Sequence, residues 1–222
     1  MAYQLREGVH WCVCDGRVVF LDLLADSYLS LPPGADAAFL RLVGGELDDD
    51  DLERLRALVL RGMLVENLGP PVLPSTAQVE AASEDFSEQS CARAKARDVL
   101  RALVHQCLWS WKLRSRGLAT TIEASRQLRM RAACSRGSSG ARLLSVLAGF
   151  HAASLLLPPA ERCLVRALAL RAICCRMGIR PTLVFGVRMN PFQAHCWLQL
   201  SGKVLIGDFE QVRLFTPVMA LE

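Results

Sequence analysis

Three residues near the C-terminal end of the chain have side chains that together could carry out acyl chemistry: Cys163, His195 and Asp208. A cysteine thiolate is a nucleophile, an imidazole moves protons, and a carboxylate orients the imidazole. Taken alone, Cys163 is one of nine cysteines, and an isolated cysteine is more often a small buried apolar residue. Taken alone, His195 is more often a structural histidine. The elements expected to carry the three residues favour the chemical interpretation.

The first of these elements is a helix predicted over Ala160–Met177, opened by Pro158-Pro159 and closed by Gly178. Cys163 then lies in its first turn. The unpaired N–H groups and the helix dipole at that end favour a thiolate over a thiol. The same N–H groups are also suited to face a developing oxyanion.

The other two residues are expected on a hairpin. His195 lies on a predicted strand, Ala194–Leu200, and Asp208 just follows the next strand, Lys203–Ile206, with Ser201-Gly202 as the turn. Neighbouring antiparallel strands bring such residues within hydrogen-bond reach, and the Cys163 helix is expected to pack across the sheet.

The alternation of side chains along this strand separates the neighbours of His195. Trp197 shares the face of His195, where it either covers the site or belongs to the core. Cys196 is expected on the opposite face, away from the catalytic side.

The rest of the second half is expected to be helical before it becomes a sheet. Predicted helices with 3.6-residue periodicity cover Ala92–Arg114, Thr121–Ala133 and Ala141–Leu157, and a strand covers Ile179–Val187. Helices followed by an antiparallel sheet indicate an α+β fold.

The first 74 residues indicate a separate small domain. Predicted strands cover Val9–Cys14, Arg17–Leu23 and Ser27–Leu31, a helix covers Ala35–Val43, a second runs from Asp48 to Gly62, and a strand covers Met63–Asn67. The proline-rich Leu68–Pro74 and the polar stretch up to Ser90 are typical of a linker. We therefore expect domains at 1–74 and 91–222, with a linker at 75–90.

Composition narrows the class of protein. The chain has 222 residues, of which 52% are hydrophobic and 22% charged, so it can bury a core and is not disordered by composition. No apolar run reaches the roughly 18 residues of a membrane span, and residues 1–10 lack a secretory apolar region. Nine scattered cysteines without such a signal favour free thiols in a reducing cytoplasm.

Charge is distributed unevenly: the net charge is −10 over residues 1–90, +10 over 91–142 and +4 over 143–222. The basic stretch is read either as solvated helix faces or as a surface for an acidic partner. Nucleic acid is disfavoured as that partner, because no nucleic-acid motif is present and aromatics make up only 6%.

A zinc site is the metal alternative, with Cys174, Cys175, His195 and Cys196 as its ligands. It is disfavoured, because adjacent cysteines on a helix point about 100° apart. We expect no metal and no cofactor.

Several motifs of the second half carry a resemblance to a known family. They are Cys163–Leu170, Gly178-Ile179, Phe185–Arg188, Pro191-Phe192, Ala194–Trp197, Gly202–Val204 and Phe215–Pro217. Over about residues 155–217 the chain resembles the lasso-peptide B proteins, which are leader peptidases with a transglutaminase-like, papain-like cysteine protease fold. The resemblance implies a Cys163–His195–Asp208 triad. The family's Ala-His-Ala-Trp reads Ala-His-Cys-Trp here, and the step from His195 to Asp208 is one residue longer than its common pattern.

The N-terminal segment resembles the precursor-recognition domain of the same pathway through Val19–Asp22 and Asp26–Pro32. The resemblance implies a winged-helix-like unit of three strands and three helices that binds the leader as an added strand. The candidate leader-binding residues are Ser27, Tyr28, Leu29, Ser30 and Leu31 on the third strand, with Arg54, Leu58 and Arg61 on a helix face. A merely solvated edge strand is the alternative.

Together the two resemblances imply a peptidase that removes the leader from a ribosomally made lasso-peptide precursor and so frees the amine for ring closure. They also imply a partner, a lasso cyclase of the asparagine-synthetase-like type that uses ATP. Two alternatives stay open. One is an inactive adaptor that delivers the precursor to another enzyme, and the other is a transglutaminase-like enzyme that transfers the acyl group to an amine.

Overall fold

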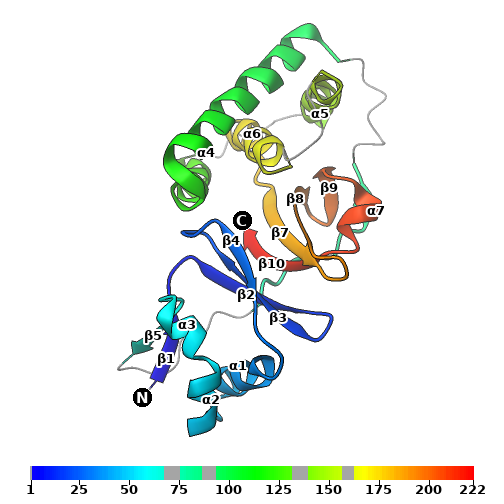
Figure 1. Ribbon diagram of the computed structural model, residues 1–222. Coiled ribbons are helices and arrows are strands. Elements are labelled where there is room, and N and C mark those ends of the chain that lie inside the picture. Colours follow the sequence, from blue (N-terminus) through cyan, green and yellow to red (C-terminus); the bar gives the residue numbers. More distant parts are fainter. Residues whose placement is uncertain (1, 68–75, 87–93, 132–139, 157–162) are drawn as a thin grey trace.

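The computed structural model describes residues 2–67, 76–86, 94–131, 140–156 and 163–222 (Figure 1). An N-terminal unit of strands and short helices lies at one end of the molecule, and three longer helices lie at the other, with a second sheet between them. The structure is therefore a mixed α+β fold, as the sequence predicts.

The N-terminal unit contains a three-stranded antiparallel sheet in the order β2-β3-β4 and a two-stranded sheet of β1 and β5. Its elements are β1 (Ala2–Leu5), β2 (Val9–Cys14), β3 (Arg17–Asp22), β4 (Ser27–Ser30), α1 (Ala35–Gly44), α2 (Asp49–Arg54), α3 (Arg56–Leu60) and β5 (Leu64–Asn67). Asp15-Gly16 makes the β2–β3 turn with positive φ at both residues, 49° and 73°. The winged-helix-like arrangement stays a prediction.

The second unit is built on a five-stranded sheet in the order β10-β7-β8-β9-β6. Its elements are β6 (Glu84–Asp85), α4 (Ala96–Arg131), α5 (Gly140–Ser154), α6 (Cys163–Arg176), β7 (Thr182–Arg188), β8 (Gln193–Leu200), β9 (Lys203–Ile206), α7 (Phe209–Val212) and β10 (Thr216–Leu221). All pairings are antiparallel except that of β6 with β9.

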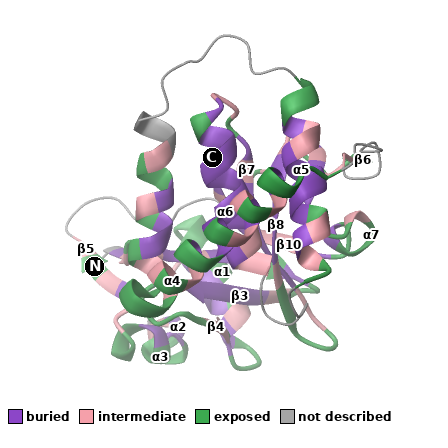
Figure 2. Ribbon diagram, turned by 90° about the horizontal axis from the view of Figure 1, so that it is seen from above, coloured by how far each residue is buried: buried purple, intermediate pink, exposed green. Residues whose placement is uncertain are grey.

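Helix α6 is the central element of this unit. It packs between α4 and β8, and its side chains from Ala167 to Cys175 are buried (Figure 2). The fully buried Arg171 donates from its guanidinium to the carbonyls of Ser125 on α4 and of Glu222 at the chain end, at 2.6 and 2.8 Å. These bonds fix the helix to its surroundings, because a buried charge is tolerated only when it is hydrogen-bonded.

Both faces of the N-terminal sheet are covered, and Figure 2 shows β3 buried along almost its whole length. Val18 and Phe20 of β3 face the core formed with α1, α2 and α3, whereas Val19 and Leu21 face the core formed with α4 and α6. The uninterrupted apolar run of β3 has this physical origin, since a strand buried on both sides has no polar face. The two units therefore share a hydrophobic core.

Strand β10 joins the two units, because it pairs with β7 on one side and packs against β2 and β3. The sequence analysis does not predict it. Pro217 lies inside the strand and argues against a central position, and β10 is indeed an edge strand with a register irregularity between Pro217 and Met219.

The predicted linker differs from what the structure contains. Of residues 75–90, those from 76 to 86 are described. Their later part lies beside the β8–β9 hairpin, with β6 as a short strand parallel to β9. Ser83 N donates to Gly202 O at 2.8 Å, and the Gln199 side chain donates to Glu80 O at 2.7 Å. Leu68–Pro74 lies outside the described residues.

The predicted helices are found with changed boundaries. The helix expected from Asp48 to Gly62 is divided into α2 and α3. Gly117 interrupts α4 with φ of 74° and ψ of 174°, where two helices are predicted. The expected start of the Cys163 helix at Pro158–Ala160 lies outside the described residues, and α6 is described from Cys163. Within the described ranges, no helix is long and apolar enough to span a membrane.

A test of the helical layer uses Gly149, where α5 approaches α4 so closely that an added Cβ lies 2.7 Å from the backbone carbon of Asp98. We expect Gly149→Ala to lower the free energy of unfolding by about 1–3 kcal/mol, because the two helices must separate. Urea unfolding followed by circular dichroism measures this change. Gly140→Ala on the same helix, with nothing within 4 Å of its Cβ, is the control. Equal stability of the two variants contradicts the close packing.

Candidate active site

Cys163 is the first residue of α6, and the packing of α6 against β8 brings its half-buried thiol to the start of that strand. The thiol and the backbone N–H of Cys196 and the ring of His195 lie close enough to this sulfur to shift its pKa. The Cys196 thiol contributes most to lowering the pKa of Cys163 to about 4, and His195 and the Cys196 N–H add to this against the opposing effect of burial. Cys163 is therefore a thiolate at neutral pH.

Cys196 does not lie where the sequence analysis expects it. Because α6 covers the face of β8 that carries Cys196 and Leu198, the Cys196 side chain is buried against the helix and beside Cys163. Burial, with the adjacent Cys163 sulfur, raises the pKa of Cys196 well above its ordinary value. Cys196 thus keeps its proton and acts as a donor. The expectation that it points away from the catalytic side is wrong.

The His195 ring is held by aromatic side chains. It stacks with Trp197 at 6.4 Å between centroids and 19° between planes, and it lies 5.4 Å from the Phe215 ring. Gly186 lies opposite His195 in the β7–β8 register, where a Cβ comes within 2.7–2.9 Å of Trp197 and Phe215. Only glycine leaves room for this arrangement. Of the two expected roles of Trp197, both are present, since it also belongs to a buried cluster.

Asp208 is engaged elsewhere. It is the N-cap of α7, and its carboxylate accepts from the backbone N–H of Glu210 at 3.1 Å, from that of Gln211 at 3.4 Å and from the Gln211 amide at 3.0 Å. The Nε2 atom of His195 is buried and has no hydrogen-bond partner among the described residues. The structure thus brings Cys163 and His195 together, and it shows no hydrogen bond from Asp208 to the imidazole.

The N-terminal unit also reaches this site. Tyr28 of β4 packs into the core cluster that includes Cys163 and Cys196, and its ring lies 5.7 Å from that of Phe192 in the β7–β8 turn. Burial, with the nearby Cys196 and Cys163 sulfurs, raises the pKa of the Tyr28 phenol. The neutral Tyr28 phenol therefore lies near the thiol.

The predicted leader-binding residues divide into exposed and buried ones. β4 is an edge strand of its sheet, with Ser27 and Ser30 exposed and Tyr28 and Leu29 half-buried. The N-terminal core contains the other two apolar candidates, Leu31 and Leu58, which are 2% and 0% exposed.

The expectation that Leu31 and Leu58 bind a peptide is wrong, because their apolar side chains are buried in the N-terminal core and are not exposed to a partner. Arg54 lies 3.7 Å from the Asp51 carboxylate, and Arg61 is exposed at the end of α3.

Arg166 adds positive charge near the thiol. It lies one helical turn after Cys163, is half-buried, and interacts electrostatically with the Cys163 sulfur. Burial lowers its pKa, and its Nε atom is buried without a hydrogen-bond partner in the part of the chain that the structure describes. Arg166 is not among the site residues predicted from the sequence, although its spacing from Cys163 places both residues on one face of the helix.

The zinc alternative does not fit the geometry. Cys174 lies eleven residues after Cys163 on α6, a separation of about 16 Å along the helix, whereas Cys196 contacts Cys163. No group of three or more potential ligands among the described residues could hold a metal ion.

Comparison with known proteins bears on the second unit. Residues 103–220 match the transglutaminase-like superfamily, which includes cysteine proteases and transglutaminases. No curated protein and no solved structure matches the chain. The matched range contains the nucleophilic thiol, the imidazole beside it and every strand of the second sheet except β6. The chain therefore belongs to the transglutaminase-like superfamily.

Proposed function

We propose that this protein is a cysteine peptidase that removes the leader from a ribosomally made lasso-peptide precursor. The observation that carries the proposal is Cys163 at the first residue of α6, where Cys196 and the His195 ring lower the pKa of its thiol to about 4. A low-pKa thiol beside an imidazole is the arrangement that nucleophilic catalysis by cysteine requires. The resemblance described above supplies the substrate class.

In the proposed reaction the Cys163 sulfur attacks the carbonyl carbon of the scissile bond and forms a tetrahedral oxyanion. The C–N bond then breaks, and the departing amine takes a proton from the His195 imidazolium, which leaves a thioester on Cys163. His195 next removes a proton from water, whose oxygen displaces the thiolate. Arg166 is suited to stabilise the negative charge that develops near the thiol.

The N-terminal unit is proposed to deliver the substrate. A leader that pairs with the open edge of β4 lies on the strand that carries Tyr28, which borders Cys163. Because the two units share a core, this edge has a fixed place relative to the thiol. Binding there raises the effective concentration of the scissile bond at Cys163. Ser27, Tyr28, Leu29 and Ser30 are the contacts we propose.

Cleavage at the leader–core junction frees the α-amine of the core peptide. The proposed consumer of this product is a lasso cyclase of the asparagine-synthetase-like type, which activates a core carboxyl with ATP and closes the lactam ring. We expect a short precursor reading frame and an amidotransferase-like gene beside this gene, and sequencing of that region checks this expectation.

Two competing functions have specific observations in their favour. The first is an inactive adaptor that only carries the precursor. It is favoured because the Asp208 carboxylate caps α7 and forms no described hydrogen bond to His195. Membership of the transglutaminase-like superfamily favours the second, transfer of the acyl group to an amine. The product distinguishes all three, since hydrolysis gives an acid, transfer gives an amide and an adaptor gives neither.

The first test replaces the nucleophile. We expect Cys163→Ala to abolish cleavage of a matched lasso-peptide precursor, because Cys163 is the thiol whose pKa His195 and Cys196 lower to about 4. Mass spectrometry of the products, with and without added glycine amide, reports acid against amide. Cys107→Ala, which removes an exposed thiol on α4, is the control and should cleave normally. Undiminished cleavage by Cys163→Ala overturns the proposal.

The second test concerns the ionisation of the thiol. Iodoacetamide labelling of Cys163 should be half-maximal near pH 4, fall below that pH and stay constant above it, because only the thiolate reacts. Cys196→Ala removes the strongest donor and should move this midpoint upward by about one unit or more. Cys196→Ser keeps a donor and should restore much of the shift. A midpoint near the ordinary cysteine pKa in the unaltered protein refutes the assignment.

The third test addresses delivery by β4. We expect Tyr28→Ala to raise KM for the precursor about tenfold with little change in kcat, since it removes binding surface that the ground and transition states share. Tyr28→Phe keeps the ring and should behave like the unaltered protein. Val43→Ala, which shortens an exposed side chain on α1, is the control. If Tyr28→Ala lowers kcat and leaves KM unchanged, β4 does not bind the substrate.

A further inference from the structure

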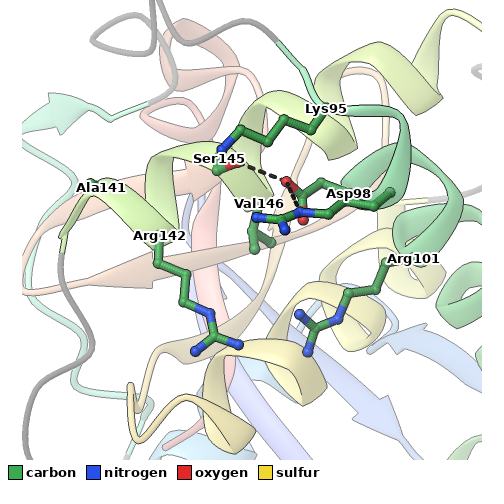
Figure 3. Close-up of a pocket in the computed structure, with 8 residues that line it drawn as sticks. Lys95, Asp98, Arg101, Ala141, Arg142, Ser145 and Val146 are labelled. Atoms are coloured by element: carbon green, nitrogen blue, oxygen red, sulfur yellow. Dashed lines mark hydrogen bonds and ion pairs between the residues drawn. The ribbon is translucent and has the colours of Figure 1, made fainter.

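A hollow lies between the beginnings of α4 and α5, with a volume of about 620 Å³. Figure 3 shows its lining, which comes from the two helices: Lys95, Arg97, Asp98, Arg101, Ala141, Arg142, Ser145 and Val146. Its volume is within the roughly 300–1,000 Å³ of small-molecule sites. In Figure 1 this end of the helical layer lies far from the N-terminal unit.

The charge of the lining is strongly one-sided, with four cations against the single carboxylate of Asp98. That carboxylate is already engaged, because Ser145 Oγ donates to it at 2.7 Å and Arg97 Nε lies 3.9 Å away. Asp98 is also buried, at the place where α4 meets Gly149 of α5. The hollow thus has a net charge of +3 from these side chains.

Two of the cations converge. The guanidinium groups of Arg101 on α4 and Arg142 on α5 enter the hollow from opposite sides and point toward one another (Figure 3). Neither forms an ion pair within the described ranges. Two like charges held face to face repel one another, and an anion between them relieves that repulsion. The planar guanidinium matches oxyanions through paired hydrogen bonds.

The start of α5 adds an independent attraction for anions. Ala141 and Arg142 are the second and third residues of this 15-residue helix, and both line the hollow. The first backbone N–H groups of a helix have no partner within it, and the helix dipole makes this end positive.

The neighbouring His105 reports the same positive field. It is buried on α4, and its ring lies 3.4 Å from a guanidinium nitrogen of Arg176. Burial, together with the charges of Arg176, Arg101 and Lys112, lowers the pKa of His105 to about 4. Because the His105 imidazole is neutral, it neither adds to nor offsets the positive charge of Arg101 and Arg142.

We propose that this hollow binds a small molecule through its diphosphate group. A net charge of +3 is matched by a group of two or three negative charges, whereas a single carboxylate leaves most of it unbalanced. The acidic N-terminal unit does not occupy the hollow, because the two lie at opposite ends of the molecule (Figure 1). The site is separate from Cys163, and it gives part of the basic stretch of residues 91–142 a role other than solvation.

The test titrates the full-length protein with inorganic pyrophosphate by isothermal calorimetry at fixed ionic strength, with sodium chloride as the balance. We expect saturable binding at one site per chain. Arg101→Gln and Arg142→Gln should each weaken it about tenfold or more, since each removes a charged hydrogen-bond donor. Arg116→Gln, an exposed residue of α4 that does not line the hollow, makes the same change in net charge and should bind normally.

Other outcomes overturn the proposal. If Arg116→Gln weakens pyrophosphate binding as much as the other two variants, the effect is one of general charge. If no saturable heat is seen at fixed ionic strength, there is no site. Citrate or oligoglutamate binding more tightly than pyrophosphate shows a carboxylate or acidic-peptide site instead. Urea unfolding of each variant separates loss of binding from loss of fold. A variant that keeps its stability and loses pyrophosphate binding supports the site.

Discussion

The packing of α6 across β8 is the contact on which the chemistry of this protein depends. It presses the first residue of the helix, Cys163, against Cys196 and His195. Burying a thiolate is unfavourable unless donors surround it. Here those donors are the thiol and the backbone N–H of Cys196 and the imidazole of His195. The buried Arg171 holds the same helix to α4 and the chain end, so the thiol cannot move away without breaking that network.

The second constraint is the two-sided burial of the N-terminal sheet. Because Val18 and Phe20 face one core while Val19 and Leu21 face the other, the sheet is fixed between its own helices and the second unit. Tyr28 therefore reaches the surroundings of Cys163, and the open edge of β4 has a constant place relative to the thiol. A recognition unit on a free tether offers no such geometry.

Asp208 illustrates a limit of inference from residue order. An aspartate after a strand is compatible with orienting a histidine on the neighbouring strand, and also with capping the next helix. In this structure the short helix α7 follows directly, and its N–H groups take the carboxylate. Strand β10 illustrates another limit, because Pro217 makes an edge strand look like a loop. In both cases the local residues allow more than one structure, and the packing of the neighbouring elements selects one of them.

The sequence by itself determined the elements and the alternation of their faces. Turn residues, apolar alternation and helical periodicity predict β2, β3, β7, β8, β9, α1, α5 and α6. They also place Cys163 early in its helix. Only the tertiary structure decided that α6 covers the Cys196 face of β8, that Tyr28 borders the thiol, and that Arg101 and Arg142 converge. Propensity and periodicity act over a few residues, whereas these contacts join segments far apart in the chain, whose meeting depends on how whole helices and sheets pack.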